Sequence, residues 1–138
     1  MRICVALCCF ALSGAAFAQQ PGRTLEQTIE KYLFGGYVDG QGVKQMRRAG
    51  DSAAVALSRV LSDRELSNDQ IECAASILDS AFSEPGWIEN PSDREPRTTL
   101  LILRYLDLCA QGPPLKAKIA EVRRHVTDQA AKPVKPNP

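Results

Sequence analysis

The chain has 138 residues, of which 44% are hydrophobic, and its 17 basic and 16 acidic side chains leave a net charge of +1. This length suits one domain with a core of its own. The balanced charge argues against a nucleic-acid-binding protein, which usually carries a strongly basic stripe. The charge is divided unevenly, with −6 over residues 51–112 and +4 over residues 113–138. An acidic surface balanced by a basic last helix is the interpretation that we favour.

The N-terminus has the pattern of a secretory signal peptide. Arg2 precedes an apolar run at residues 3–12, and Ala16 and Ala18 provide the small residues of an A-x-A cleavage site. The run is too short for a membrane span, which needs roughly 20 apolar residues. We therefore expect residues 1–18 to be removed and the mature chain to be exported, periplasmic or extracellular, without inserting into a membrane.

Two helices are predicted near the start of the mature chain. Residues 19–24 are expected to form an exposed segment, and a T-x-x-Q capping box at 24–27 opens the first helix. Apolar residues recur there at i, i+4 and i+8, and a double glycine at 35–36 ends the helix. A short basic helix is predicted over residues 43–49. The buried positions expected in the first helix are Leu25, Ile29 and Leu33.

A helical hairpin is predicted over residues 50–82. Asp51 or Ser52 is expected to cap its first helix, and an S-x-x-Q capping box at 67–70 opens its second helix. Apolar residues at helical spacing give each helix one face that can be buried. They are Val55, Leu57, Val60 and Leu61 in the first helix and Ile71, Ala75, Leu78 and Phe82 in the second.

A second hairpin is predicted after a loop at residues 83–95. Pro96 suits the first turn of a helix, and the segment TLLILRYLDLCA is apolar nearly all round, which predicts a central, buried helix. A Gly-Pro-Pro break at 112–114 precedes the last helix. The apolar face of that helix carries Leu115, Ile119, Val122 and Val126. The proline- and lysine-containing tail at 129–138 is expected to be disordered.

No stretch of the sequence alternates with the period of a strand, so the predicted class is all-α. We expect five to six short helices in antiparallel hairpins, forming a single domain over residues 25–128.

The two hairpins match each other in sequence. The first helices align at an offset of 45 and the second helices at an offset of 44. The pairs are Val55 with Leu100, Leu57 with Ile102, Arg59 with Arg104, Leu61 with Leu106, Ile71 with Leu115, Ala75 with Ile119, Leu78 with Val122 and Phe82 with Val126. A helical pair that repeats every 40 to 47 residues, roughly, has the HEAT or armadillo period.

With this period and the segment MRRAGDSAAVALSRVL, the sequence resembles a short HEAT-like repeat protein. Its first two helices, 25–34 and 43–49, would then form an atypical capping repeat. The second unit departs from the pattern, because Glu95-Pro96 replaces Gly50-Asp51. The resemblance implies a right-handed stack that presents a surface to another protein, and an irregular helical bundle is the alternative.

Two cysteines, Cys73 and Cys109, remain after removal of the signal peptide. An oxidising compartment favours a disulfide between them, and two buried free thiols are the alternative. Neither a CxxC nor an HxxxH spacing is present, so we expect no metal site.

Few residues suit catalysis. The only histidine, His125, lies one turn from Glu121, which predicts an i, i+4 ion pair or a histidine facing solvent. The glycine pairs form no phosphate-binding loop. The spacing of the carboxylates between residues 84 and 95 matches no EF-hand calcium loop. We therefore expect a protein without enzyme activity or cofactor, and a small hydrolytic enzyme is an alternative.

The loop at 83–95 is the segment least typical of a scaffold. Loops of this length are often functional, and this one carries the only tryptophan, Trp87, among charged residues, a composition typical of a binding hot spot. The alternative is that Trp87 and Ile88 fold back onto the preceding helix. We hypothesise a contact surface for a basic or mixed-charge protein, formed by Trp87, Ile88, Glu84, Glu89, Asp93 and Arg94.

A different class of function is a small-ligand carrier with a cavity between its helices. Its lining would come from Trp87, Tyr32, Tyr37 and Tyr105.

Overall fold

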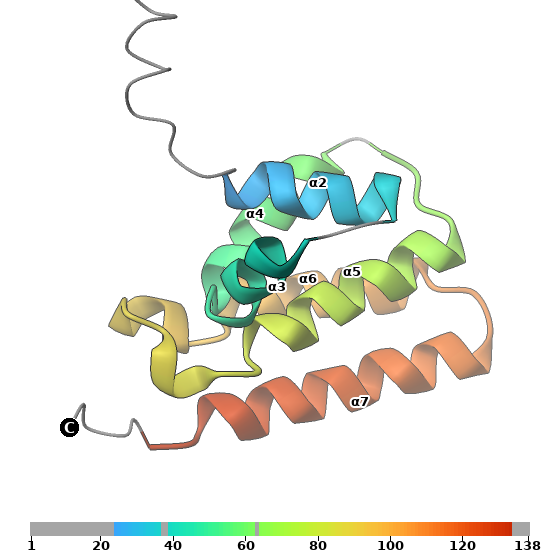
Figure 1. The fold of residues 1–138 in the computed structure, drawn as a ribbon. Coiled ribbons are helices and arrows are strands. Elements are labelled where there is room, and N and C mark those ends of the chain that lie inside the picture. Colours follow the sequence, from blue (N-terminus) through green and yellow to red (C-terminus); the bar gives the residue numbers. More distant parts are fainter. Residues whose placement is uncertain (1–23, 37–38, 63, 134–138) are drawn as a thin grey trace, which may run out of the picture.

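A computed structural model describes residues 24–36, 39–62 and 64–133, and within them the chain is all-α, as predicted (Figure 1). Six α-helices, two short 3-10 helices and no strand are found in these ranges. They are α2 (Leu25–Gly35), α3 (Gly40–Arg47), α4 (Asp51–Leu61), α5 (Asn68–Ala81), η1 (Pro85–Trp87), η2 (Pro91–Arg94), α6 (Arg97–Cys109) and α7 (Pro113–Ala130). The predicted signal peptide at 1–18 and the last residues of the tail lie outside the described residues, and α7 continues two residues past the expected end of the domain.

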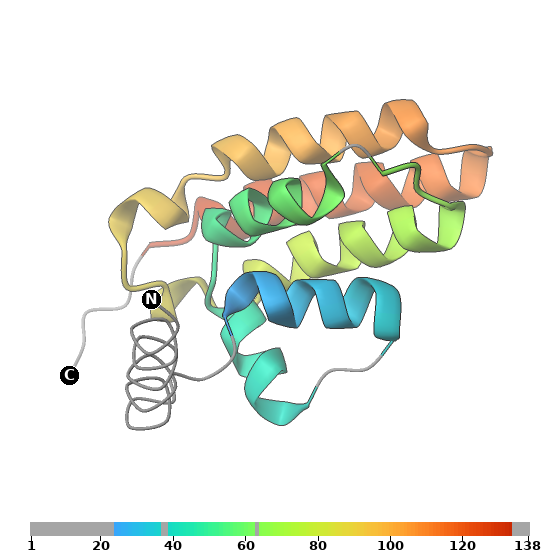
Figure 2. The same ribbon diagram turned by 90° about the horizontal axis from the view of Figure 1, so that it is seen from above.

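The helices form two layers. In one layer α4 contacts α2 on one side and α6 on the other, and in the second layer α5 contacts α3 and α7. Helices α2, α4 and α6 run in one direction, and α5 and α7 run back, as Figures 1 and 2 both show. The chain therefore builds three antiparallel hairpins, α2–α3, α4–α5 and α6–α7, placed side by side. None of the helices in the described ranges is both long and apolar enough to cross a membrane.

The core lies between the two layers and consists of the predicted apolar faces. The second helix of each predicted hairpin contributes at equivalent positions, since Ala75 and Leu78 in one and Ile119 and Val122 in the other are all buried. The largest fully buried side chains are Phe82, Ile29, Leu57, Ile71, Ile77, Leu78, Ile88, Leu103, Leu106, Ile119 and Val126. Val55 departs from the prediction, because its side chain is exposed on α4.

Two of the predicted helix starts are confirmed by their caps. The Thr24 hydroxyl accepts from the Gln27 backbone N–H at 3.2 Å while the Gln27 side chain accepts from Thr24 N–H at 3.1 Å. Ser67 and Gln70 form the same reciprocal pair. Helix α3 begins three residues earlier than predicted, because the carboxylate of Asp39 accepts from the Gly42 N–H at 2.8 Å and caps it.

The predicted cap of α4 is wrong. Gly50 is the N-cap residue and α4 has no side-chain cap. Instead the buried carboxylate of Asp51 caps α6: it accepts from Thr98 N–H at 3.1 Å, from Thr99 N–H at 2.7 Å and from the Thr99 hydroxyl at 2.8 Å. The N-cap residue of α6 itself is Pro96, which provides no side-chain acceptor. Asp51 thus satisfies backbone donors of a helix that begins 46 residues later in the chain.

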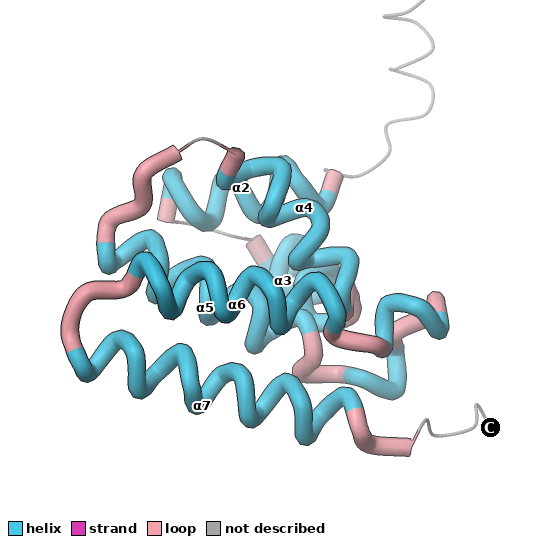
Figure 3. Tube along the Cα trace, turned by 180° about the vertical axis from the view of Figure 1, so that it is seen from behind, coloured by secondary structure: helices cyan, strands magenta, loops and turns pink. Residues whose placement is uncertain are grey.

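The prediction that the helix at 97–109 is central and buried is also wrong. Only Thr99, Leu103 and Leu106 of α6 are buried, whereas Leu101, Tyr105 and Leu108 are exposed. The reason is position: α6 is the last helix of its layer, so it has α4 on one flank and no further described helix beyond it. An apolar helix therefore exposes one of its apolar stripes to solvent. Figure 3 shows that no other described helix covers that side of α6.

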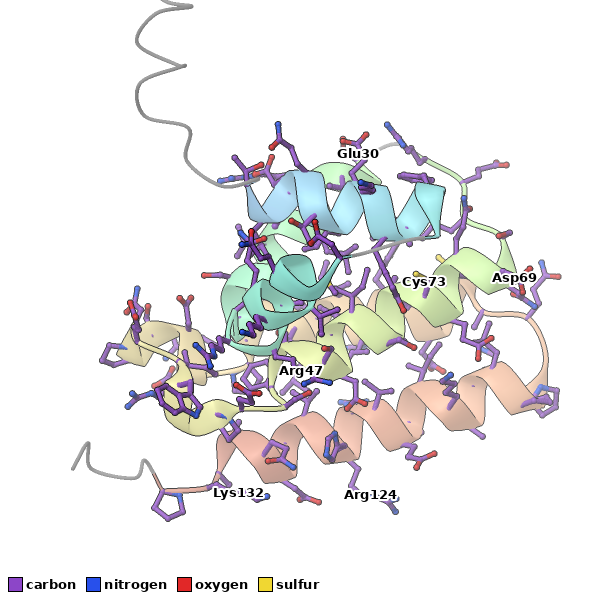
Figure 4. All side chains as sticks on the ribbon, in the orientation of Figure 1. Glu30, Arg47, Asp69, Cys73, Arg124 and Lys132 are labelled. Atoms are coloured by element: carbon purple, nitrogen blue, oxygen red, sulfur yellow. The ribbon has the colours of Figure 1, made fainter. Side chains whose placement is uncertain are left out.

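The predicted disulfide is not formed. Cys73 and Cys109 are both free thiols. Cys73 lies on the side of α5 that faces α2, with its sulfur 3.8 Å from the Tyr32 carbonyl oxygen (Figure 4), while Cys109 is exposed at the end of α6. The two thiols therefore lie in different surroundings, one partly buried between helices and the other exposed.

The two thiols are expected to differ in reactivity. Burial raises the pKa of Cys73 to about 11, so near pH 8 it stays a protonated thiol, and its alkylation rate should rise as the pH approaches that value. Cys109 is exposed and should react first. Maleimide labelling of the native mature protein, followed by peptide mass spectrometry, tests this, with Cys109→Ser as the control that isolates Cys73. Equal labelling rates at the two sites would contradict it.

Candidate protein-binding surface

Residues 83–96 connect the second hairpin, α4–α5, to the third, α6–α7, and we call this segment the connector. Its two 3-10 helices, η1 and η2, follow each other with only three residues between them. The connector begins against α3, where Glu84 N–H donates to the Arg47 carbonyl oxygen at 3.3 Å. It ends against α4, where Asp93 accepts a hydrogen bond from the Ser52 hydroxyl at 2.7 Å. The start of the connector is thus bonded to the first hairpin and its end to the second.

Ile88 anchors the middle of the connector. Its side chain is 1% exposed and belongs to the core. Arg94 closes the segment over it, since its Nε and Nη2 donate to the Ile88 carbonyl oxygen at 3.0 and 2.8 Å. Two of the predicted contact residues therefore have structural roles: Ile88 is buried, and Arg94 binds the backbone of Ile88.

Gly50 permits the connector to approach the corner between α3 and α4 closely. Its N–H donates to the Ala81 carbonyl oxygen at 3.0 Å, and its φ of +58° is a conformation that favours glycine. A Cβ at this position would lie 2.2 Å from the Asp93 carbonyl oxygen and 3.1 Å from Cδ1 of Ile88. The corner formed by Gly50, Asp51 and Ser52 thus holds both the connector and the start of α6.

Trp87 lies on the surface of the connector. It is 61% exposed, although Ile88 directly after it is buried. The guanidinium carbon of Arg48 lies 4.8 Å from the centroid of the Trp87 ring, and Arg48 Nε also pairs with Glu84 at 3.1 Å. Arg48 therefore supports one side of the ring as a cation–π contact. Of the two residues that were expected to fold back together, only Ile88 does so.

The charges around Trp87 are mixed and largely paired. Glu84 pairs with Arg48, and Glu95 pairs with Arg97 at 2.9 Å. Asp93 is occupied by Ser52, and Glu89 is exposed. The acidic character that the sequence suggests for this loop is therefore partly neutralised by arginines, one of them from the end of α3.

His125 does not pair with Glu121 but with a residue of another helix. Its Nδ1 bonds Oδ1 of Asp79 on α5, and its Nε2 lies 3.0 Å from Nε2 of Gln129. The pair borders a groove of about 420 Å³ whose described lining is Asp79, Lys118, Glu121, Val122, Arg124, His125 and Asp128. That lining offers acids and bases but no serine, threonine or cysteine nucleophile. We interpret the His125–Asp79 pair as a contact that stabilises the packing of α7 against α5.

The described aromatic residues that were considered for a small-ligand cavity do not share a site. Tyr32 is half-buried, Trp87 and Tyr105 are exposed, and Tyr37 lies outside the described residues. In the described part of the chain, Tyr32, Trp87 and Tyr105 are absent from the lining of the main grooves between the helices. Within the described residues, no three histidine, cysteine or acidic side chains are grouped to hold a metal ion.

The exposed apolar face of α6 was not predicted from the sequence. Leu101, Tyr105 and Leu108 recur there at i, i+4 and i+7, directly opposite the buried side of the helix. A hydrogen bond to Cys109 raises the pKa of Tyr105. The signal was present in the sequence, since this helix has more apolar residues than one buried face requires.

Comparison of the chain with protein-family models, with curated proteins and with solved structures found no match. Its function is therefore inferred from the fold and from these surfaces.

Proposed function

We propose that this protein is an exported, non-catalytic helical scaffold of HEAT-like type that binds a protein partner through the connector. The signal-peptide pattern of residues 1–18 supports export, and the layered hairpins support the scaffold. The observation that carries the binding proposal is the exposed ring of Trp87 on an anchored segment.

A binding surface gains most from large side chains that are already in place. Tryptophan is enriched among the residues that dominate binding energy, and a preorganised side chain loses little freedom on association. The backbone of Trp87 is fixed next to buried Ile88, and Arg48 contacts the ring. An exposed tryptophan that is positioned this way is suited to insert into a pocket of a partner.

The surrounding charges indicate the kind of partner. Arg48 and Glu84 form a partly exposed ion pair beside the ring, and Glu89 adds an exposed carboxylate. A partner with an apolar pocket and a mixed-charge rim fits this surface, since opposite charges across a rim steer association and fix orientation.

The test is Trp87→Ala in the mature protein. Because most of the ring is exposed, the melting temperature should change by no more than about 2 °C. The affinity for the partner should fall roughly 30-fold, the loss of about 2 kcal/mol typical of a hot spot. The partner is first identified by affinity capture with crosslinking from the exported fraction, and its affinity is then measured by titration calorimetry.

The chain offers a matched control in Phe34→Ala. Phe34 is an exposed aromatic residue on α2, and Arg64 lies 4.5 Å from its ring centroid, as Arg48 does near Trp87. This variant removes the same kind of aromatic–arginine contact at another place and should leave partner affinity unchanged. Unaltered affinity in Trp87→Ala would overturn the proposal, as would equal losses in the two variants.

A further inference from the structure

Glu84 and Trp87 lie on the same side of the turn η1. Glu84 is the N-cap residue of η1, and its carbonyl oxygen accepts from the Trp87 N–H at 3.0 Å. In a 3-10 turn the side chains at i and i+3 are nearly eclipsed, so these two leave the backbone in a similar direction. Pro85, directly after Glu84, restricts the turn further because its ring fixes φ. The turn thus presents a carboxylate and an indole ring as neighbours.

One residue of the first hairpin contacts both of these side chains. Arg48 is the C-cap residue of α3. Its Nε lies 3.1 Å from Oε2 of Glu84, and its guanidinium carbon lies 4.8 Å from the centroid of the Trp87 ring. A planar guanidinium can lie over an aromatic ring and donate to a carboxylate at the same time. Arg48 therefore joins Glu84 and Trp87 from outside the connector.

Backbone hydrogen bonds bring Arg48 to this position. The Arg47 carbonyl oxygen accepts from the Glu84 N–H at 3.3 Å, and the Gly50 N–H donates to the Ala81 carbonyl oxygen at 3.0 Å. These bonds come directly before and shortly after Arg48 in the chain, and they hold the end of α3 against the start of the connector (Figures 1 and 2). The location of Arg48 therefore does not depend on its own ion pair, which is at the surface and contributes little to stability.

We propose that Arg48 is a positioning residue of the partner-binding surface, which holds the Trp87 ring in one orientation and covers one of its faces. This inference rests on the proposed function, since it concerns how the same tryptophan meets the partner. The partner must then contact the other face of the ring or its edge. A second cation on that other face would be repelled by the guanidinium. The partner group that meets Trp87 is therefore neutral and apolar, such as an aliphatic side chain or a proline, rather than a lysine or arginine.

Fluorescence of the mature chain tests the orientation without a partner. Trp87 is the only tryptophan, so the emission reports on this ring alone. Time-resolved anisotropy separates motion of the ring from tumbling of the molecule, and the native ring should show little fast motion of its own. Arg48→Ala should add a large fast component, while the melting temperature changes by no more than about 2 °C. An unchanged anisotropy decay in Arg48→Ala would overturn the proposal.

Quenching by ions of opposite charge tests whether the cation lies at the ring. Iodide and caesium both quench tryptophan on collision, and Arg48 attracts the first and repels the second. Without Arg48, the carboxylates of Glu84 and exposed Glu89 are the nearest charges along the connector. Arg48→Ala should therefore raise the ratio of caesium to iodide quenching roughly 3-fold, as expected for a screened unit charge close to the ring. A constant ratio would contradict the proposed position of Arg48.

Three further variants separate the charge of Arg48 from its shape. The ammonium of Arg48→Lys can pair with Glu84 or lie over the ring but not both, so ring motion should fall between that of the native chain and that of Arg48→Ala. Glu84→Gln removes the charge that orients the guanidinium and should also give intermediate motion. Arg64→Ala is the matched control, because it removes the guanidinium beside Phe34 and should leave the fluorescence of Trp87 unchanged. An equal gain of motion in Arg64→Ala would overturn the assignment to Arg48.

Partner affinity distinguishes this inference from the proposed function. Arg48→Ala should weaken binding roughly 5-fold, because the partner must then order a side chain that was held in place before. If Trp87→Ala leaves binding unchanged, the proposed function fails and the fluorescence results are unaffected. If Trp87→Ala weakens binding and Arg48→Ala does not, the positioning role is overturned and the proposed function stands. A partner lysine or arginine found over the ring in the structure of the complex would also overturn the inference.

Discussion

Gly50→Ala is expected to destabilise the fold strongly, because both the backbone conformation and the surroundings of Gly50 exclude a Cβ. The φ of +58° strains any residue with a Cβ, at a cost of about 1–3 kcal/mol. The added Cβ would also lie 2.2 Å from the Asp93 carbonyl oxygen, a backbone atom that cannot move alone. The connector would have to shift and take Ile88 out of the core. We therefore expect a loss on the order of 4 kcal/mol or more.

Thermal and urea unfolding of the mature variant measure this loss. With about 4 °C for each kcal/mol in a domain of this size, the melting temperature should fall by roughly 15 °C. Gly36→Ala is the matched control, because Gly36 also has a positive φ, +72°, but a Cβ added there would have no atom within 4 Å. That variant should lose only about 1 kcal/mol. Equal losses in the two variants would show that the contact with Asp93 is unimportant.

Asp51→Ala is expected to have the second largest effect. The Asp51 carboxylate is buried and accepts three hydrogen bonds from Thr98 and Thr99 at the start of α6. Its removal leaves two backbone donors and one hydroxyl without their acceptor. Loss of a helix cap costs about 1–2 kcal/mol, and each further buried donor left unsatisfied adds about 1 kcal/mol or more. We expect a loss of about 3 kcal/mol, measured by urea unfolding.

Thr99→Val separates the contribution of the Thr99 hydroxyl from that of the two backbone N–H groups. It removes the hydroxyl donor, keeps the shape of the buried side chain and leaves both backbone donors bonded to Asp51. We expect a loss of about 1 kcal/mol. In a double-mutant cycle the two losses should be less than additive, because Asp51→Ala has already removed the partner of the hydroxyl. Strict additivity would mean that the hydrogen bond at 2.8 Å contributes nothing.

The corner at residues 50–52 also connects stability to the proposed function. Gly50 admits the connector, Ser52 bonds Asp93 within it, and Asp51 begins the helix that follows it. The position of Trp87 therefore depends on a corner that lies about 35 residues earlier in the chain. Variants at this corner are expected to weaken partner binding as well as stability, whereas Trp87→Ala should weaken binding alone.

Most of the helices, and the starts of α2 and α5, follow from local patterns in the sequence. The capping boxes at 24–27 and 67–70 are formed as predicted, and the apolar residues of α5 and α7 face the core. These features are predictable because a cap and a helical face involve residues only three or four positions apart, so the local pattern contains all the interacting groups.

Which groups meet across the chain depends on the packing of the hairpins. Asp51 has the sequence position of a local cap, yet its partner Thr99 lies 48 residues away. His125 has Glu121 one turn before it but bonds Asp79, 46 residues away. In each case the local pattern offers a possible partner, but the bond is formed with a residue of a distant helix. The choice depends on how the hairpins pack, which local spacing does not contain.

The packing of the hairpins also explains the exposed surfaces at Trp87 and on α6. Trp87 and Ile88 are adjacent apolar residues, and the packing of the connector against Gly50 decides that one is buried and the other exposed. In α6 the sequence determined that the helix is apolar on two sides. Only its place at the end of a layer decided that the side carrying Leu101, Tyr105 and Leu108 faces solvent, because burial needs a neighbouring helix on that side.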